Sequence, residues 1–547
     1  DAAKRPPPSP TLWEQARDIL CVRGPDRTLV TRLNACLPWF AHDGLTHSSA
    51  PPGPGQYNGG AWGTRDVTQG SVELMLALDR PDVVRGILGE VFRHQWAGTG
   101  GWPQWFMLEP FGFIQPRDMH GDIPLWPLMA LCDYLEATDD LAFLDAEAGW
   151  TDPESARPIA RCSTIRDHVG QVVAWMQREF LGETCLLSYG HGDWDDSLQP
   201  ARPELRTRLA SAWTAALSYQ VLRRLEAVFA RAGRPPAGLE GLADRVAADF
   251  QKHLVIDGVV CGFRLFDEDL KGGQPMLHPL DQASGIRYRL LPMTRSILAG
   301  LFTPEQARHH LGLIRHHLLA ADGARLMDRP AHYSGGPQHI FQRAESAAAF
   351  SREISVFYTH AHIRYLDAMA RLGEAEALWA GLGMAMPAGL AESVPHTTPR
   401  QANTFFSSSD AAVHDRYEAE ERYDAIKRGE VPVHGGWRLY SSGPGLFCLL
   451  VRTRVLGVRR RFGEVVFDPV LPAETDGLTA EMAWGTGRLR LAVRGCGAGR
   501  VVRRVVVGGQ PVADAREEPN PYRTGGLAVP ATLLPAAGTH EVVVEMG

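Results

Sequence analysis

The feature that most restricts the fold of this chain is a long succession of helical segments. Between residues 66 and 375, apolar residues recur with helical spacing, for example in "RPDVVRGILGEVFRHQW" (80–96) and "STIRDHVGQVVAWMQREFLG" (163–182). Pro81 suits a first helical turn, and Ser163 or Thr164 suits an N-cap. Further helices are expected at about 125–137, 203–232, 238–254, 304–320, 350–372, 374–383 and 446–456. This series predicts a mainly α fold, an antiparallel helical toroid that gathers its connecting loops at one end.

After about residue 455 the sequence changes to strand patterns. Segments such as "LTAEMAWGTGRLRLAVRG" and "GRVVRRVVVGGQPV" alternate apolar with polar residues, and the "GG" pair marks a hairpin turn. We therefore predict a C-terminal β-sandwich over residues 456–547. The predicted domains are an N-terminal linker region (1–54), the helical domain (55–455) and this sandwich.

Composition excludes several classes of protein. The 547 residues carry a formal net charge of −7, so a nucleic-acid partner is not expected. No apolar stretch approaches the roughly 20 residues that cross a bilayer, and the start of the chain lacks the apolar core of a secretory signal, so we expect a soluble, cytoplasmic protein without a membrane partner. The 8 cysteines show no metal-ligand spacing and predict buried, reduced thiols.

The connecting loops are rich in aromatic, acidic and glycine residues. "SYGHGDWDDSLQPA" (188–201) places Asp193, Asp195 and Asp196 around Trp194. Neighbouring loops add Tyr57, Trp62, Arg65, Asp66, Trp102, Trp105, Arg117 and Asp122. Aromatic faces with planar polar groups and carboxylates favour a sugar-binding cleft over a nucleotide or metal site. The alternative is a solvated aspartate-rich turn with an incidental tryptophan.

Cleavage of a glycosidic bond needs a carboxylic acid that protonates the leaving oxygen, and a second group that supplies or activates the nucleophile. Three aspartates within four residues interact with one another. We expect like-charge repulsion, together with burial against Trp194, to let at least one of them keep its proton near neutral pH.

Five motifs, taken in order, carry a resemblance to a known family. They are "YNGGAWGTRDVTQG", "RDMHGDIPLWPLMALCDYLEATDD", "HGDWDDSLQP", "FYTHAHIRYLDAMARLG" and "GGWRLYSSGPGLFCLLVRTRVLGVRRRFGEVVFDPVLP". The chain resembles the cellobiose-phosphorylase family, glycoside hydrolase family 94, over residues 55–475, and within it the members that act on β-1,2-linked glucooligosaccharides. The resemblance implies an (α/α)6 barrel followed by a β-sandwich. It also implies an inverting phosphorolysis that releases α-glucose 1-phosphate.

The resemblance also implies roles for individual residues. Asp196 takes the position of the general acid, and Trp194 lines the sugar site. Arg117 and Asp122 match residues that hold the transferred glucosyl unit, although the spacing around them departs by about one residue from the cellobiose enzymes. We expect Asp193 and Asp195 to orient the loop and bind sugar hydroxyls. Arg65 and Asp66 contact the sugar or form a structural ion pair.

The family binds phosphate at the starts of two barrel helices. His360 matches the first of these positions, and Ser441 and Ser442 match the second, where the family has a Thr-Gly pair. Free backbone N–H groups and the helix dipole suit a dianion at such a place. The simpler alternatives are a hydrogen-bonded helix histidine and a serine N-cap.

Two other functions remain open from the sequence. An inverting hydrolase on the same barrel needs a carboxylate base about 6.5–9.5 Å from the acid, for which Glu345, Glu353 or Glu392 are candidates. A non-catalytic glucan-binding fragment is the second alternative. The sequence indicates no metal or organic cofactor, with inorganic phosphate as co-substrate, and a homodimer is possible. Family members carry a further β-sandwich region before the barrel, and this chain begins near the linker that follows it.

Overall fold

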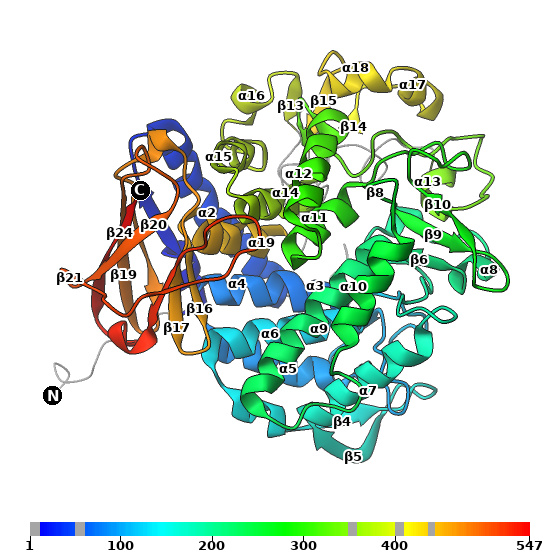
Figure 1. The fold of residues 1–547 in the computed structure, drawn as a ribbon, viewed down its shortest axis with the longest axis horizontal. Helices are drawn as coiled ribbons and strands as arrows, with labels where there is room; N and C mark the ends of the chain where they lie inside the picture. Colours follow the sequence, from blue (N-terminus) through cyan, green and yellow to red (C-terminus); the bar gives the residue numbers. More distant parts are fainter. Residues whose placement is uncertain (1–10, 50–60, 348–357, 400–409, 436–442) are drawn as a thin grey trace.

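A ring of six helices forms the centre of the molecule. The structure is a computed structural model that describes residues 11–49, 61–347, 358–399, 410–435 and 443–547. Within these ranges, neighbouring helices of the ring contact each other in chain order, α6 touching the π-helical turn η2 (Val67–Ser71) that leads into α4, and the last helix closes the ring against the first. They are α4 (Val72–Ala77), α6 (Leu125–Thr138), α9 (Ala212–Ala232), α11 (Leu290–Ala299), α14 (Thr359–Leu372) and α19 (Gly443–Leu450) (Figure 1).

A second set of helices alternates with the ring along the chain and covers it. In contact with the ring, α2 packs on α19, α5 on α4 and α6, α10 on α9, α12 on α11, and α15 on α14, while α7 occupies the same place in the order between α6 and α9. Their bounds are α2 (Arg27–Ser49), α5 (Pro81–Arg93), α7 (Ile165–Glu179), α10 (Leu242–His253), α12 (Pro304–Leu313) and α15 (Ala375–Met384). This alternation of inner and outer helices is an (α/α)6 barrel, as predicted. Helix makes up 44% of the chain and strand 20%, so the fold is mainly α.

Local sequence signals account for several helix ends. Pro81 stands at the first position of α5, and Thr164 caps α7 by accepting a hydrogen bond from the backbone N–H of Asp167 within a capping box. The single helix expected at 203–232 is instead divided into α8 (Pro203–Arg206), strand β6 (Leu209–Ser211) and α9. The break arises because β6 pairs with β9 (Phe263–Phe266), a partner distant in sequence.

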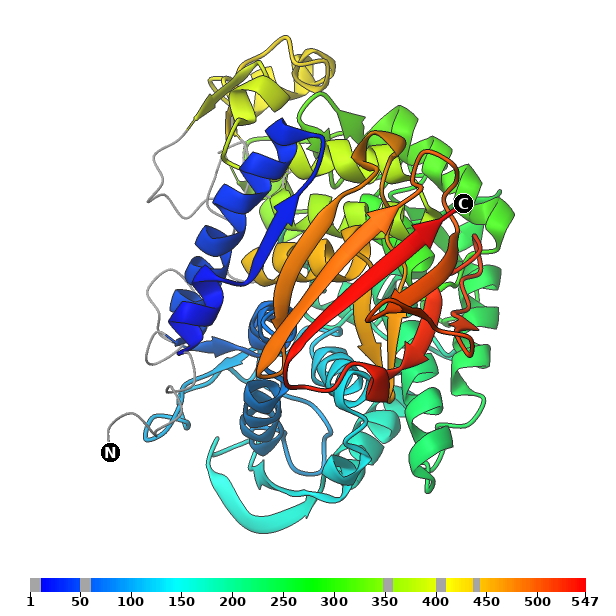
Figure 2. The same cartoon turned by 90° about the vertical axis from the view of Figure 1, so that its left-hand side faces the viewer.

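Two sheets are formed by the strands that follow the barrel, together with β1 (Leu20–Arg23) from before it. The larger has the order β1-β18-β19-β24-β20-β21 and the smaller the order β16-β17-β23-β22. Their strands are β16 (Val458–Arg461), β17 (Glu464–Phe467), β18 (Thr479–Trp484), β19 (Gly487–Arg494), β20 (Val502–Val507), β21 (Gln510–Pro511), β22 (Arg516–Glu517), β23 (Leu527–Pro530) and β24 (Thr539–Met546). Figure 2 shows these strands lying across one end of the helical ring. The predicted "GG" hairpin is confirmed, because Gly508 and Gly509 join β20 to β21 with positive φ angles of 56° and 81°.

Residues near the N-terminus contribute to both parts of the molecule. Strand β1 (Leu20–Arg23) pairs antiparallel with β18, and α2 packs against the barrel. Buried residues of α2, the barrel and the C-terminal sheets belong to one continuous hydrophobic core. The predicted domain boundaries stay predictions, but residues 20–49 tie the helical ring to the sheet that follows it.

The structure bears on two features considered from the composition, membrane-spanning helices and cysteines. None of the described helices is long and apolar enough to span a membrane. All 8 cysteines are free thiols; Cys36, Cys132, Cys261, Cys448 and Cys496 are buried, whereas Cys162 is exposed.

Candidate active site

The residues that begin the ring helices meet at one end of the barrel, which we call the N-terminal end. Arg65 lies in α3 (Thr64–Asp66), which continues through a π-helical turn into α4, and Asp122 lies just before α6. The 193–196 segment precedes α9, Arg289 precedes α11, and His360 lies in the first turn of α14. Hydrogen bonds and ring contacts join these residues, so the helical ring gathers several of the predicted site residues at one place.

A buried ion pair fixes the acidic loop. The Arg289 guanidinium donates to both carboxylate oxygens of Asp193 over 3.1 and 3.2 Å, and both side chains are fully buried. Asp193 also accepts hydrogen bonds from the Ser211 hydroxyl and the Asp195 backbone N–H. With these partners the Asp193 carboxylate holds the loop to the starts of α9 and α11.

Asp195 shapes the turn that follows. Its Oδ1 accepts from the Ser197 backbone N–H and, over 2.6 Å, from the Ser197 hydroxyl, which caps the short helix η4 (Asp196–Leu198). Asp195 is fully buried and its Oδ2 lies 3.8 Å from Arg289. Both flanking aspartates therefore orient the neighbouring Asp196, and any direct sugar contact of Asp193 or Asp195 stays a prediction.

The acidic loop is braced against the loop before α6. The Gly121 N–H donates to the Gly192 carbonyl over 2.9 Å, and Nδ1 of His120 lies 3.1 Å from the Asp193 carbonyl oxygen. Gly192 has a φ of +148°, and a Cβ there would lie 3.2 Å from the His120 ring. Glycine at this position lets the two loops approach closely.

Arg65 joins the two loops through their carboxylates. Its guanidinium donates to Asp196 Oδ1 over 3.1 Å and to the Asp193 carbonyl over 3.1 Å, and lies 3.4 Å from Asp122 Oδ2. Asp122 is fully buried, and its Oδ2 also accepts from Trp126 Nε1 over 2.8 Å. Asp122 Oδ1 is buried with no hydrogen-bond donor among the described residues. A buried acceptor without a donor is unusual in a folded protein.

The pKa values of Asp122 and Asp196 are shifted in opposite directions. Burial raises the pKa of Asp122, with Arg65 opposing that shift. Burial also acts to raise the pKa of Asp196, but the positive charges of Arg65, His120 and Arg343 outweigh it, and the net pKa of Asp196 is lowered. At Asp196 the surrounding cations therefore outweigh burial in the ligand-free protein. The expectation that at least one of the three loop aspartates keeps a proton near neutral pH stays a prediction.

Trp194 connects the acidic loop to α14. Its ring centroid lies 4.6 Å from that of His360 in an edge-on arrangement and 5.4 Å from that of Tyr358. His360 is buried, and burial first, then Arg364, Arg65 and Arg295, hold the pKa of its imidazole well below the ordinary value. The imidazole is therefore neutral at pH 7, and the cationic character of this region comes from the arginines around it.

Arg295 adds positive charge below His360. It is buried, donates to Gln220 Oε1 over 3.0 Å and lies against the faces of Trp126 and Trp213. Burial lowers the pKa of Arg295 to about 9, which still leaves it charged near neutral pH. No described carboxylate forms an ion pair with it within 4.0 Å, so this part of the cleft favours an anion.

The other predicted residues lie at different places. Arg117 is exposed, and its guanidinium donates to the Glu154 carbonyl over 2.9 Å rather than to the Asp122 cluster. The Asp66 carboxylate lies against Gly63, and a Cβ atom at position 63 would collide with this carboxylate. Arg65 forms ion pairs with Asp122 and Asp196. Ser441 and Ser442 lie outside the described residues.

Sequence reasoning missed three residues of the cluster, His120, Arg289 and Arg295. His120 lies in the quoted "MHGD" segment, directly beside a predicted residue, and the proximity itself was a usable signal. Arg289 gave a weaker signal, a single arginine before an apolar segment. Arg295 gave none, because its position inside α11 acquires meaning only when the ring closes.

No family model matches the chain. Among solved structures, a GH78 family rhamnosidase of Bacillus sp. GL1 is 13% identical and aligns over 87% of this chain and 42% of its own, with a TM-score of 0.48. A glycosidase variant in complex with glucose is 14% identical over 78% of this chain and 98% of its own, with a TM-score of 0.46.

The particular relative is a phosphorylase. The chain is 42% identical over 512 residues to the 1,2-beta-oligoglucan phosphorylase of Listeria innocua serovar 6a, which covers 93% of this chain. The chain spans about half the length of that relative, 46%. This similarity confirms the resemblance to the oligoglucan phosphorylases that the five motifs indicated.

Proposed function

We propose that the protein is an inverting glycoside phosphorylase that cleaves β-1,2-linked glucooligosaccharides with inorganic phosphate and releases α-glucose 1-phosphate. In this reaction Asp196 protonates the departing glycosidic oxygen, and phosphate attacks the anomeric carbon from the opposite face. Phosphate is already ionised at neutral pH, so one acid and one anion site are sufficient.

The observation that carries the proposal is the difference in exposure among the clustered carboxylates. Asp122, Asp193 and Asp195 are fully buried, whereas 28% of the Asp196 side chain is exposed. Of these four groups, only Asp196 has an exposed part of its side chain in the ligand-free protein. We assign Asp193 and Asp195 to positioning. Asp122 Oδ1 has no donor among the described residues, and we propose that it accepts from a hydroxyl of the glucosyl unit once bound sugar has opened a way to it.

The lowered pKa of Asp196 sets a requirement for the cycle. A general acid must hold a proton when the bond breaks. Sugar binding removes water from the carboxylate, and a phosphate dianion brings negative charge to the same cleft; both changes raise a carboxyl pKa. We therefore place proton uptake by Asp196 in the complex with both substrates, not in the free protein.

A hydrolase is the less favoured alternative. Both carboxylate oxygens of Glu345 accept backbone N–H groups of residues 339–341, and Glu392 is exposed on α16 (Leu390–Ser393), 3.6 Å from Arg32. Neither group is available as a base beside Asp196. Glu353 lies outside the described residues.

Product analysis tests the proposal. The protein is incubated with β-1,2-, β-1,3- and β-1,4-linked glucooligosaccharides, each with and without inorganic phosphate, and glucose 1-phosphate and free glucose are quantified. We expect glucose 1-phosphate only from the β-1,2-linked substrates and only with phosphate. Release of glucose without phosphate would establish the hydrolase, and binding without turnover would establish the glucan-binding fragment.

We also infer that the two C-terminal sheets are the layers of the β-sandwich implied by the resemblance. β20 contacts β23 of the other sheet, and β18 alternates partly exposed with buried residues, as a strand with one covered face does. A cytoplasmic location and a homodimer stay proposals of the same kind.

A further inference from the structure

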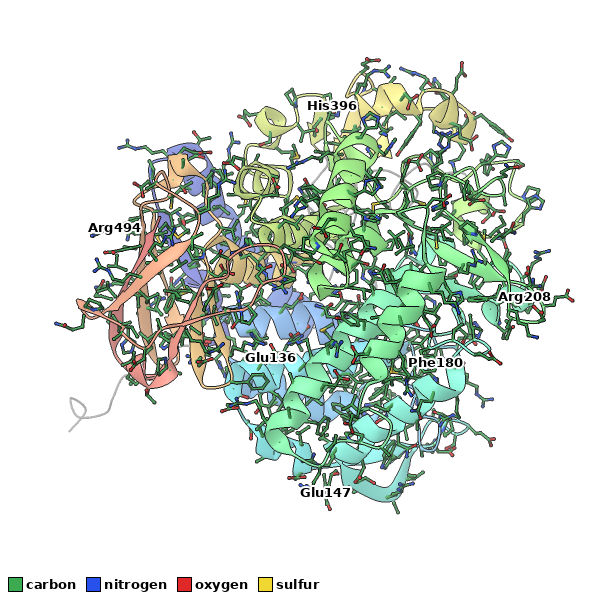
Figure 3. All side chains as sticks on the ribbon, in the orientation of Figure 1. Glu136, Glu147, Phe180, Arg208, His396 and Arg494 are labelled. Carbon is green, nitrogen blue, oxygen red and sulfur yellow. The ribbon has the colours of Figure 1, made fainter. Side chains whose placement is uncertain are left out.

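A second charged cavity lies at the opposite end of the barrel, where the ring helices finish. Its volume is about 390 Å³, and its wall combines the last turns of the ring helices with strand β16 of the smaller sheet. Figure 3 places Glu136, which lines this cavity, on the side of α6 that faces the C-terminal strands, while Arg208 lies at the far side of the barrel. A volume of this size is typical of small-molecule sites, which span roughly 300–1,000 Å³.

Arginines dominate the wall of this C-terminal cavity. Eight arginines and four carboxylates line it. Asp79 forms ion pairs with two arginines. It accepts hydrogen bonds from Arg460 over 2.9 and 3.0 Å and lies 3.6 Å from Arg452. Asp468, which does not itself line the cavity, likewise forms ion pairs with Arg459 and Arg523. The carboxylates on this side are therefore already shared between cations.

On the opposite wall, the arginines and carboxylates neutralise one another. Arg224 donates to Asp133 and Glu136 over 2.7 Å each, so these two carboxylates are engaged with one guanidinium. Arg454 is paired with Asp367 over 2.6 Å. The surplus of positive charge lies on the side of the cavity formed by α14 and β16.

Arg371, in the last turn of α14, has no counter-ion among the described residues. Among the described residues, no carboxylate pairs with its guanidinium and no side chain or carbonyl accepts a hydrogen bond from it, and its Nε is buried. Burial first, then the nearby charges of Arg454, Arg459 and Arg523, lower the pKa of Arg371 to about 10. A charged group held among like charges without a partner is costly unless a ligand compensates it.

The C-terminal dipoles of the ring helices explain part of this arrangement but not all of it. Carbonyl groups at helix ends attract cations, and Arg452 and Arg523 donate to the carbonyls of Ala77 and Ala370 in this way. Arg371 donates to none of the described carbonyls. Arg371 is nevertheless among the residues that line the cavity.

We propose that the C-terminal cavity binds a small anion of the phosphate class, inorganic phosphate or a sugar phosphate, with Arg371 as its principal ligand. The site is separate from the phosphate site proposed beside His360. Arg371 follows His360 by 11 positions on α14, which at 1.5 Å per residue corresponds to about 16 Å. The proposal does not depend on the proposed reaction.

Thermal unfolding with sulfate as probe tests this site, because sulfate is a tetrahedral dianion that does not react. The wild type, Arg371→Met, His360→Ala and the double variant are compared in chloride and in sulfate at equal ionic strength. We expect sulfate to raise Tm in the wild type and in His360→Ala, and Arg371→Met to lose most of that increase. Arg315→Met serves as the control, because Arg315 is half-exposed and paired with Glu374.

Isothermal titration with inorganic phosphate and with glucose 1-phosphate, each in the His360→Ala background, then identifies the source of the anion. Binding of either one, with at least tenfold weaker affinity after Arg371→Met, supports the proposal. If Arg371→Met does not fold, Arg371→Gln is used instead. An unchanged sulfate response in the Arg371 variant, or no anion binding in the His360→Ala background, overturns the proposal.

Discussion

The two ends of the barrel use arginine and carboxylate in opposite proportions. At the N-terminal end, one arginine is shared by two carboxylates, since Arg65 contacts both Asp122 and Asp196. At the C-terminal end, one carboxylate is shared by two arginines, since Asp79 contacts both Arg452 and Arg460. The same helices begin at one end and finish at the other, so each surplus has the sign that the helix dipole there favours.

The difference shows how one scaffold separates two kinds of chemistry. At the N-terminal end, where we propose the proton donor, the carboxylates gather, and Arg65 and Arg289 are already paired with them. At the C-terminal end, Arg371 has no partner among the described residues, which is what the proposed anion site requires. Variants at each end therefore test the comparison directly.

The largest effect is expected from Asp196→Asn. The amide keeps the shape of the side chain but cannot give a proton to the leaving oxygen, so we expect phosphorolysis to fall by about 10³-fold or more. Oligosaccharide affinity, measured by calorimetry, stays within a few-fold of the wild type. Asp82→Asn on the outer helix α5 is the matched control and should leave the rate unchanged; a near-normal rate in Asp196→Asn would place the proton donor elsewhere.

Loss of the buried ion pair is the next largest effect. Arg289→Met leaves the fully buried Asp193 without its cation, and removal of one partner of such a pair costs about 3–5 kcal/mol. Urea unfolding measures this cost. Arg234→Met removes an exposed arginine paired with Asp145 and should have a much smaller effect. Equal costs for the two variants would mean that Arg289 does not hold the acidic loop.

A smaller and more selective effect is expected from His360→Ala. The imidazole lies at the start of α14 beside Trp194, so its removal should raise KM for phosphate about tenfold, an order-of-magnitude loss of one polar contact. KM for the oligosaccharide should change little. Equal increases in both KM values would show that His360 supports the fold of the cleft and does not bind phosphate.

The smallest expected effect is on the pH dependence of the free energy of unfolding. The pKa of Asp196 lies below its ordinary value of 3.8 because Arg65, His120 and Arg343 outweigh burial. The ionised carboxylate therefore stabilises the fold above that value, and this stabilisation is lost as pH falls through the folded-state pKa. The free energy of unfolding of the wild type should exceed that of Asp196→Asn at pH 6, and the difference should shrink below pH 3.8. A difference that grows on acidification would contradict the lowered pKa.

Much of the helical barrel is predictable from local sequence. The helices α5 and α7 begin at Pro81 and after Thr164, where proline at the first turn and a threonine cap are signals carried by the sequence itself. The part that was not predictable depends on distant partners. Strand β1 is recognisable only through its pairing with β18, more than 450 residues later, and β6 exists because β9 pairs with it.

The candidate site also has features that the sequence shows and features that only the fold shows. The acidic loop with its tryptophan is visible in the sequence because its residues are adjacent. The direction of the pKa shift of Asp196 was not, because it is set by Arg65, 131 residues away, which the closed ring brings within 3.1 Å. Arg289 is likewise 96 residues from Asp193. A motif predicts which residue is the acid, whereas the direction of the pKa shift of that residue depends on the fold.

The most direct test of the account is the configuration of the first product formed, followed by proton NMR during early turnover of a β-1,2-linked glucooligosaccharide. With phosphate present, we predict that the wild type gives the α-anomer of glucose 1-phosphate from the first time point and that Asp196→Asn gives no detectable product. The β-anomer of glucose 1-phosphate, or glucose released at the same rate without phosphate, would contradict the inverting phosphorolysis proposed for this site.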